Sequence, residues 1–148
     1  MGLSKEVKEI LTNNFRLAHR PAQVYTVAVG AYNLFAVVDG PIEVITAGGY
    51  VTAAAVGATT LATTFSGIAG EAGAVAINGA VGTVVYIPVN VGGAILNAAA
   101  IPKTVATLTS MFVGPGNIIG TFGAGTSWTG ELFLVYKKLS PRSFVRML

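Results

Sequence analysis

The 148-residue sequence contains no cysteine, which excludes disulfide bonds and thiolate metal sites. Charged residues are also scarce: they make up 10% of the chain, against about 25% in average soluble domains. Only six carboxylates and one histidine are available for acid–base or metal chemistry. The surface must therefore be covered mainly by neutral polar residues or by neighbouring protein subunits.

The few ionisable side chains are scattered in a way that argues against catalysis. His19 lies between Ala18 and Arg20, where we expect a surface or interface role rather than general-base catalysis. Asp39 and Glu43 flank a turn, which explains both more simply than an acid–base pair. The glycine-rich stretches GPGNIIG and GAGTSWTG do not have the spacing of nucleotide-binding loops. We therefore expect no enzyme, no metal site and no cofactor.

Two uncharged runs, residues 44–70 and 72–102, are long enough to cross a bilayer. Gly, Thr, Asn or Pro interrupts both runs every few residues, however, so their helix propensity is poor. A membrane β-barrel would need an export signal, and the first fifteen residues have no apolar core of that kind. We expect no membrane partner, and a membrane-inserted or ligand-carrying β-barrel stays as the third alternative.

Runs rich in Val, Ile, Thr, Tyr and Phe predict short β-strands along most of the chain, among them QVYTVAVG, NLFAVV and GELFLVYKKL. Gly, Pro and Asn separate these runs at short intervals and predict turns. The pattern indicates an all-β fold: an antiparallel β-sandwich, jelly-roll-like or β-tulip body of about nine or ten short strands. Asp39-Gly40, between two apolar runs, predicts a hairpin.

Cationic side chains gather at the two ends of the chain. Residues 1–20 carry a net charge of +2 and residues 131–148 one of +3, whereas the part between them carries −2. We therefore expect an extended N-terminal arm (residues 1–21), a β body (22–136) and an extended C-terminal arm (137–148). Ser4 is placed to cap one short helix in the first arm.

Both arms interleave cations with apolar residues, which suits a protein partner better than a nucleic acid or a lipid surface. The alternative is a pair of plain solvated tails. The residues expected to bind a partner are Phe15, Arg16, Leu17, Arg20, Lys137, Lys138, Arg142, Phe144 and Arg146. Tyr50, Tyr86 and Trp128 are candidate ligand or interface aromatics, with a core or interface anchor favoured for Trp128.

Three stretches carry a resemblance to a known family: YNLFAVVDGPIEVITAGGYVT (residues 32–52), GTVVYIPV (82–89) and TGELFLVYKKLSPRSFVRM (129–147). An apolar strand with Leu-Phe-x-Val, a Gly-Pro turn and a Leu-Ser-Pro motif near the C-terminus form the pattern. With it, the chain resembles the head-decoration, or capsid cement, proteins of tailed phages. The low charge of its middle departs from the family pattern.

The resemblance implies a β-rich homotrimer on the outer surface of a phage head, where it bridges copies of the major capsid protein. It also implies that a terminal arm extends to the capsid or to a neighbouring copy. We therefore expect a structural virion protein that stabilises the head. The second alternative is a carbohydrate- or receptor-binding virion module, which would need Tyr50, Tyr86 and Trp128 exposed on one rim.

Overall fold

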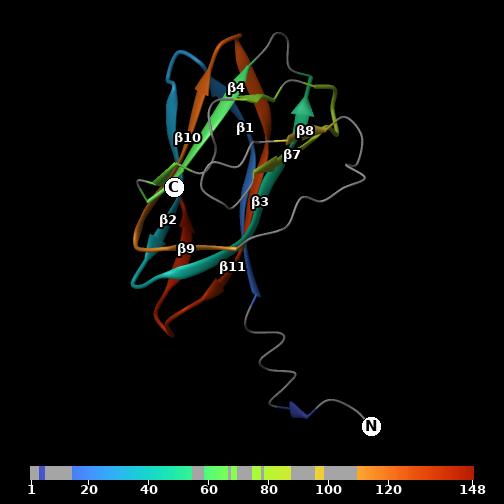
Figure 1. Ribbon diagram of the computed structural model, residues 1–148. Helices are drawn as coiled ribbons and strands as arrows, with labels where there is room; N and C mark the ends of the chain where they lie inside the picture. The colour runs from blue at the N-terminus through green and yellow to red at the C-terminus, as the bar shows by residue number, and fades with distance from the viewer. Residues whose placement is uncertain are drawn as a thin grey trace.

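The computed structural model describes residues 4–5, 15–54, 59–66, 68–69, 75–77, 79–87, 96–98 and 110–148. Within these ranges the chain forms two antiparallel sheets that face each other, as Figure 1 shows. The expected all-β sandwich is therefore confirmed. In the described part of the chain, no helix is long and apolar enough to cross a membrane.

Each sheet contains six strands. Sheet A has the order β1 (Phe15–Thr26), β11 (Ser127–Lys138), β3 (Ile42–Ala53), β7 (Val84–Ile87) and β8 (Leu96–Ala98), and β9 (Met111–Val113) also pairs with β3. Sheet B has the order β12 (Phe144–Met147), β2 (Ala31–Val38), β10 (Gly116–Gly123), β4 (Thr60–Phe65) and β5 (Ile68–Ala69), and β6 (Val75–Ala76) also pairs with β4. Four of these twelve strands have only two or three residues.

The order in which the chain visits the two sheets defines the topology. The chain crosses from sheet A to sheet B between β1 and β2, returns with β3, and crosses again with β4. The four-stranded parts β1-β11-β3-β7 and β2-β10-β4-β5 then have the strand order of a jelly roll, an architecture found in viral capsid and lectin domains.

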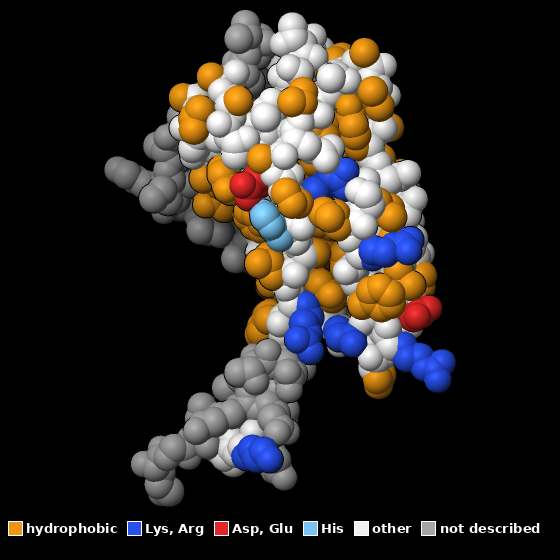
Figure 2. Space-filling model, turned by 180° about the vertical axis from the view of Figure 1, so that it is seen from behind, with side chains coloured by type: hydrophobic (Ala, Val, Ile, Leu, Met, Phe, Trp, Pro, Cys, Tyr) orange, Lys and Arg blue, Asp and Glu red, His pale blue; other side chains and the backbone are white. Residues whose placement is uncertain are grey.

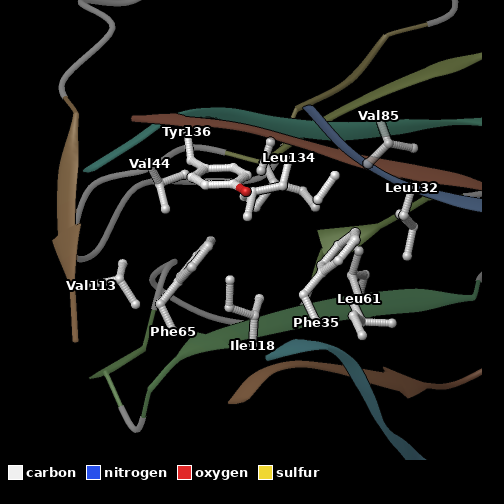
Figure 3. Packing of buried hydrophobic residues seen from close by; sticks show 14 of the residues in the cluster. Phe35, Val44, Leu61, Phe65, Val85, Val113, Ile118, Leu132, Leu134 and Tyr136 are labelled. Carbon is white, nitrogen blue, oxygen red and sulfur yellow. The ribbon is translucent and has the colours of Figure 1, made fainter. Parts of the chain in front are cut away.

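Alternating burial along the strands builds the core between the sheets. On β11, Trp128, Leu132, Leu134 and Tyr136 are buried, while Thr129, Glu131, Phe133 and Val135 are partly exposed. This period of two is the signature of a strand with one face on a core. Figure 3 shows the inward side chains of sheet B, Phe35, Leu61, Phe65 and Ile118, pointing toward Val44, Leu132, Leu134 and Tyr136 of sheet A.

An aromatic cluster fills one end of this core. The rings of Tyr25 and Phe122 are stacked with their centroids 4.6 Å apart, and Tyr32 meets Tyr25 edge-on at 5.1 Å. The Trp128 ring lies 5.7 Å from that of Tyr25. Ring pairs of this kind contribute about 0.5–1.5 kcal/mol each beyond their buried area. The cluster joins β1, β2, β10 and β11.

The residues around Asp39-Gly40 do not form the hairpin that the sequence predicted. They connect β2 in sheet B to β3 in sheet A, and these two strands do not pair with each other. Asp39 has a φ of 57° and Gly40 one of 143°, far from the value of about 90° that the second residue of a type I′ hairpin turn requires. The segment is therefore an arch between the sheets, not a turn within one.

The expected terminal arms also differ from the structure. Residues 15–20 belong to β1 and pair with β11, while Phe144–Met147 form β12 and pair with β2. Pairing satisfies the backbone N–H and C=O groups that a free arm would leave to water. The expected boundary after residue 21 falls at a register shift inside β1. The expected helix after Ser4 lies outside the described residues, apart from Ser4 and Lys5.

Candidate functional site

The outer face of sheet A, which points away from the core, carries six of the twelve exposed large hydrophobic side chains among the described residues. They are Phe15, Leu17 and Val24 on β1, Tyr50 on β3, Tyr86 on β7 and Phe112 on β9. Leu17 is 66% and Phe112 70% exposed. We call this surface the outer face of sheet A.

Cross-strand neighbours join these residues into continuous rows. Leu17 lies opposite Val135, and His19 lies opposite Phe133. Phe133 in turn lies opposite Gly48, which lies opposite Tyr86. Side chains directly opposite each other on one face lie about 4.5–5.5 Å apart, so each row is in lateral contact across the sheet.

Gly48 makes the centre of this face flat. A Cβ atom on Gly48 would lie 2.9 Å from Cζ of Phe133 and 2.6 Å from the carbonyl oxygen of Val85. The ring of Phe133 therefore lies across the glycine backbone instead of standing up from the sheet. Any larger residue at position 48 would displace this ring.

A hydrogen-bonded group lies beside the Phe133 ring. The imidazole Nε2–H of His19 donates to Oε2 of Glu131 over 2.6 Å. Hydrogen bonds from His19 first, and from the Tyr50 hydroxyl second, hold the pKa of Glu131 below its usual value. The hydrogen bond to Glu131 raises the pKa of Tyr50.

A second ion pair lies nearer the start of β1. Lys137 Nζ is 3.9 Å from Oε2 of Glu43 and 4.9 Å from the centre of the Phe15 ring. Exposed pairs of this kind contribute only about 0–1 kcal/mol to stability. The main effect of this pair is that it reduces the net charge of the surface. Both described carboxylates of this face, Glu43 and Glu131, have a basic partner on the same face.

The outer face of sheet B is polar by comparison. Its outward residues on β4 and β10 include Thr60, Thr64, Asn117 and Thr121. The side-chain amide of Asn117 donates to Oδ1 of Asn33 on β2 over 3.3 Å. Thr and Asn side chains share this part of sheet B with Ala62 and Ile119, whereas the outer face of sheet A carries exposed aromatic and aliphatic side chains.

Arg20 is not at the surface, contrary to its predicted place among the partner-binding residues. Only 8% of it is exposed. Its guanidinium donates to the Tyr25 hydroxyl over 3.0 Å, to the Leu34 carbonyl over 2.9 Å and to the Leu148 carbonyl. Burial raises the pKa of Tyr25, and the charge of Arg20 acts in the opposite direction. Arg20 therefore joins β1, β2 and the residue after β12.

Trp128 is fully buried, so it is the core anchor that was favoured for it and not a ligand-binding aromatic. Its indole Nε1 has no hydrogen-bond partner among the described groups. Tyr50 and Tyr86 do lie on one surface, because Tyr50 is two residues beyond Gly48, the residue opposite Tyr86. The structure therefore brings two of the three candidate aromatics together.

The other predicted partner-binding residues lie toward one end of the sandwich or on β12. Arg16 and Lys138 are near the start of β1 and the end of β11, and Arg142 is in the loop that follows. Lys138 Nζ donates to the carbonyl of Pro141 over 2.8 Å. Phe144 and Arg146 are exposed on β12. We call Arg16, Lys138 and Arg142 the basic end.

Figure 2 shows the single histidine, in pale blue, beside an acidic side chain and bordered by hydrophobic ones. Blue Lys and Arg side chains lie below this group in the same view. Among the residues that the structure describes, no group of three His, Asp or Glu side chains could hold a metal ion.

Comparisons with known proteins give no match: no family model, no curated protein and no solved structure is similar to this chain. The interpretation of the surfaces therefore depends on their own geometry and on the motifs in the sequence.

Proposed function

We propose that this chain is a structural virion protein that coats the outer surface of a tailed-phage head and stabilises it by bridging copies of the major capsid protein. The observation that carries the proposal is the outer face of sheet A, a broad apolar surface whose two described carboxylates have basic partners on the same face. Contiguous apolar surfaces of this kind are typical of protein–protein contacts.

Two of the stretches that carry the family resemblance form one structural unit. Residues 32–52 contain β2, the arch and β3, and residues 129–147 contain β11 and β12. β11 pairs with β3, and β12 pairs with β2. The two turns meet as well, since the amide of Leu139 donates to the carbonyl of Pro41 over 3.2 Å. The two motifs therefore supply strands that pair with each other and two turns that are in contact.

The jelly-roll topology is consistent with this function but is not evidence for it by itself, because one fold serves many functions. Capsid and lectin domains both use this architecture. The lectin-like alternative loses support because Trp128, one of the three aromatics that it needs at the surface, is inside the core.

The basic end is suited to an acidic capsid surface. Glu43 is paired with Lys137, so Arg16, Lys138 and Arg142 give this end a positive charge against Asp39. Charges at the rim of an interface mainly accelerate association and orient the partner. A protein that binds the assembled head better than free capsid subunits stabilises the assembly by mass action.

Mixing the purified chain with undecorated heads tests the proposal. We expect a fixed number of copies to bind per head, measured by quantitative gel analysis of sedimented heads, and a higher rupture temperature of the heads. Heads that bind no copies at saturating protein concentration would overturn the proposal. Binding to glycan arrays without binding to heads would favour the receptor-binding alternative instead.

A further inference from the structure

We propose that pH regulates the binding of the outer face of sheet A to the capsid, and that His19 is the residue that takes up the proton. The inference rests on the proposed function, because it concerns the surface that carries that function. It states that the protein binds heads more tightly in mildly acidic than in mildly alkaline solution. The net charge of the pair His19–Glu131 causes the difference.

The two ion pairs of this face differ in their cation. Lys137 pairs with Glu43, and a lysine side chain is charged throughout the neutral range of pH. His19 pairs with Glu131 over 2.6 Å and is charged only when it is protonated. Histidine is the residue type whose ordinary charge change falls between about pH 5 and 8. The face therefore has one fixed pair and one pair whose net charge becomes negative as the pH rises.

The titratable pair lies among apolar side chains of the face. His19 is opposite Phe133, and Leu17, two residues before His19 on β1, is 66% exposed. Tyr50 lies opposite Glu131 on the other side of β11. The side chains of His19 and Glu131 are 47% and 22% exposed. A partner that covers the apolar neighbours therefore also removes water from this pair.

The charged groups around His19 keep their charge in this range of pH. Glu131 is ionised, because hydrogen bonds from His19 first and from Tyr50 second hold its pKa below the ordinary value of 4.5. The hydrogen bond to Glu131 raises the pKa of Tyr50 from 10.0, so the phenol stays neutral. The described strands packed against β1 otherwise carry only Tyr, Lys and Arg among their titratable residues, and these types titrate well above neutral pH. They are Tyr136, Lys137 and Lys138 on β11, Tyr32 on β2 and Arg146 on β12.

The direction of the effect follows from the charge that binding would bury. In mild acid, a protonated His19 balances the ionised Glu131, and an apolar partner covers a neutral pair. In mild alkali, the imidazole is neutral, so binding either buries the carboxylate without a counter-ion or requires the uptake of a proton. Both routes weaken binding, because a buried charge needs a partner. We expect heads to be bound about tenfold more weakly at about pH 8.5 than at about pH 5.5, which linkage to one proton supplies within about one pH unit.

The test measures the affinity of the full chain for undecorated heads at about pH 5.5, 7 and 8.5 and at constant salt, by quantifying free and bound copies after sedimentation. His19→Gln leaves Glu131 without a cation at every pH. Groups of the capsid that titrate act on both proteins alike, so the ratio of the two affinities isolates His19. This ratio of unmodified protein to His19→Gln should fall about tenfold from the lowest to the highest pH.

Two further variants make the test specific to the pair. Glu131→Gln leaves His19 without its carboxylate, so the pair is neutral only in mild alkali and the pH dependence should be reversed. Glu43→Gln is the matched control, because it removes a carboxylate of the same face whose partner is a lysine. It should keep the pH dependence of the unmodified protein.

The outcomes separate this inference from the proposed function. Unmodified protein and His19→Gln that bind heads with the same pH dependence would overturn the inference and leave the proposed function standing. A dependence that Glu131→Gln does not reverse would also overturn it, since the partner would then not sense the net charge of the pair. Loss of the dependence in Glu43→Gln would overturn the assignment to His19. Heads that bind no copies at any of these pH values would overturn the proposed function and this inference with it.

Discussion

At the scale of the residue, Arg20 has the most unusual environment in the described structure. It is a buried cation whose hydrogen-bond acceptors include a phenol, the side-chain amide of Gln23 and the backbone carbonyl of Leu34. A guanidinium presents five donors in a fixed geometry, so it can satisfy several strand ends at once. Removing it would leave the Leu34 carbonyl and the Tyr25 hydroxyl buried without this partner.

We therefore expect Arg20→Met to lower the free energy of unfolding by about 2–4 kcal/mol, because unsatisfied buried polar groups cost about 1–3 kcal/mol each. Urea unfolding followed by the fluorescence of Trp128, the only tryptophan, measures the change. Arg16→Met on the same strand is the control, since Arg16 is exposed, and it should change stability by less than about 0.5 kcal/mol. Equal effects of the two substitutions would contradict the role given to Arg20.

Glu131 gives a pH-dependent prediction. Its pKa is lowered in the folded protein, so the folded state binds fewer protons than the unfolded state as the pH falls below the ordinary value of 4.5. The stabilisation by His19 and Tyr50 is therefore present above pH 4.5 and is lost as the pH falls through the lowered pKa. Glu131→Gln should remove this part of the acid sensitivity.

Measuring the unfolding midpoint in urea from pH 7 to pH 3 tests this prediction. The unmodified protein should lose stability more steeply below pH 4.5 than Glu131→Gln does. Parallel curves for the two proteins would show that the hydrogen bonds to Glu131 do not favour its ionised form.

At the scale of the element, the arch between β2 and β3 and the turn between β11 and β12 depend on each other. A Cβ atom on Gly40 would lie 2.6 Å from Oγ of Ser140, and Gly40 has a φ of 143°, which side chains rarely adopt. Gly40→Ala should therefore lower the free energy of unfolding by about 1–3 kcal/mol through strain and steric conflict.

A double-mutant cycle separates the two causes. Ser140→Ala removes the hydroxyl that conflicts with the new methyl group but leaves the backbone conformation of residue 40 unchanged. The double variant Gly40→Ala/Ser140→Ala should thus be more stable than the two single changes added together, with a coupling energy of about 0.5 kcal/mol or more. Strict additivity in chemical denaturation would mean that the two turns are independent.

The elements differ in how well the sequence predicts them. The strands β3, β7 and β11 follow from their β-branched and aromatic residues, because these match a pleated surface with one buried face. β1 does not follow, since its pattern is inverted: Phe15 and Leu17 face outward, whereas Arg20 is inside. Because Arg20 is in the core and Phe15 and Leu17 are at the surface, the sequence of this segment does not show the pattern of a strand with one buried face, and it was interpreted as a terminal arm.

The candidate site could be predicted only in part for a similar reason. Phe15, Leu17 and Tyr50 were singled out as contact residues, and they do lie on one face. The pairing of His19 with Glu131 spans 112 positions of sequence and depends on the register between β1 and β11, which no local pattern specifies.

At the scale of the whole molecule, charge and apolar surface are separated. The net charge of +3 is carried largely by the chain ends, whereas the outer face of sheet A pairs its own charges. Binding to heads should therefore have two components: a salt-sensitive one from the basic end, and a largely salt-independent one from the outer face of sheet A.

Charge reversal at the basic end separates these components. The variant Lys138→Glu/Arg142→Glu should slow association with heads by about tenfold at low salt, with a much smaller effect at about 1 M salt, where the Debye length is about 3 Å. Stopped-flow light scattering measures the rates. In the absence of heads, the sedimentation behaviour of this double variant should match that of the unmodified protein. Association rates that do not depend on salt would contradict a role for the basic end.

The position of β11 between β1 and β3 has a consequence for biosynthesis. The ribosome makes this central strand about a hundred residues after β1, so among the described strands the one that begins at Phe15 lacks its sheet partner until then. At about 5–20 residues per second, β1 stays unpaired for several seconds or longer. Sheet A therefore cannot close before β11 has been synthesised, and the apolar side chains of β1 stay exposed to water during that interval.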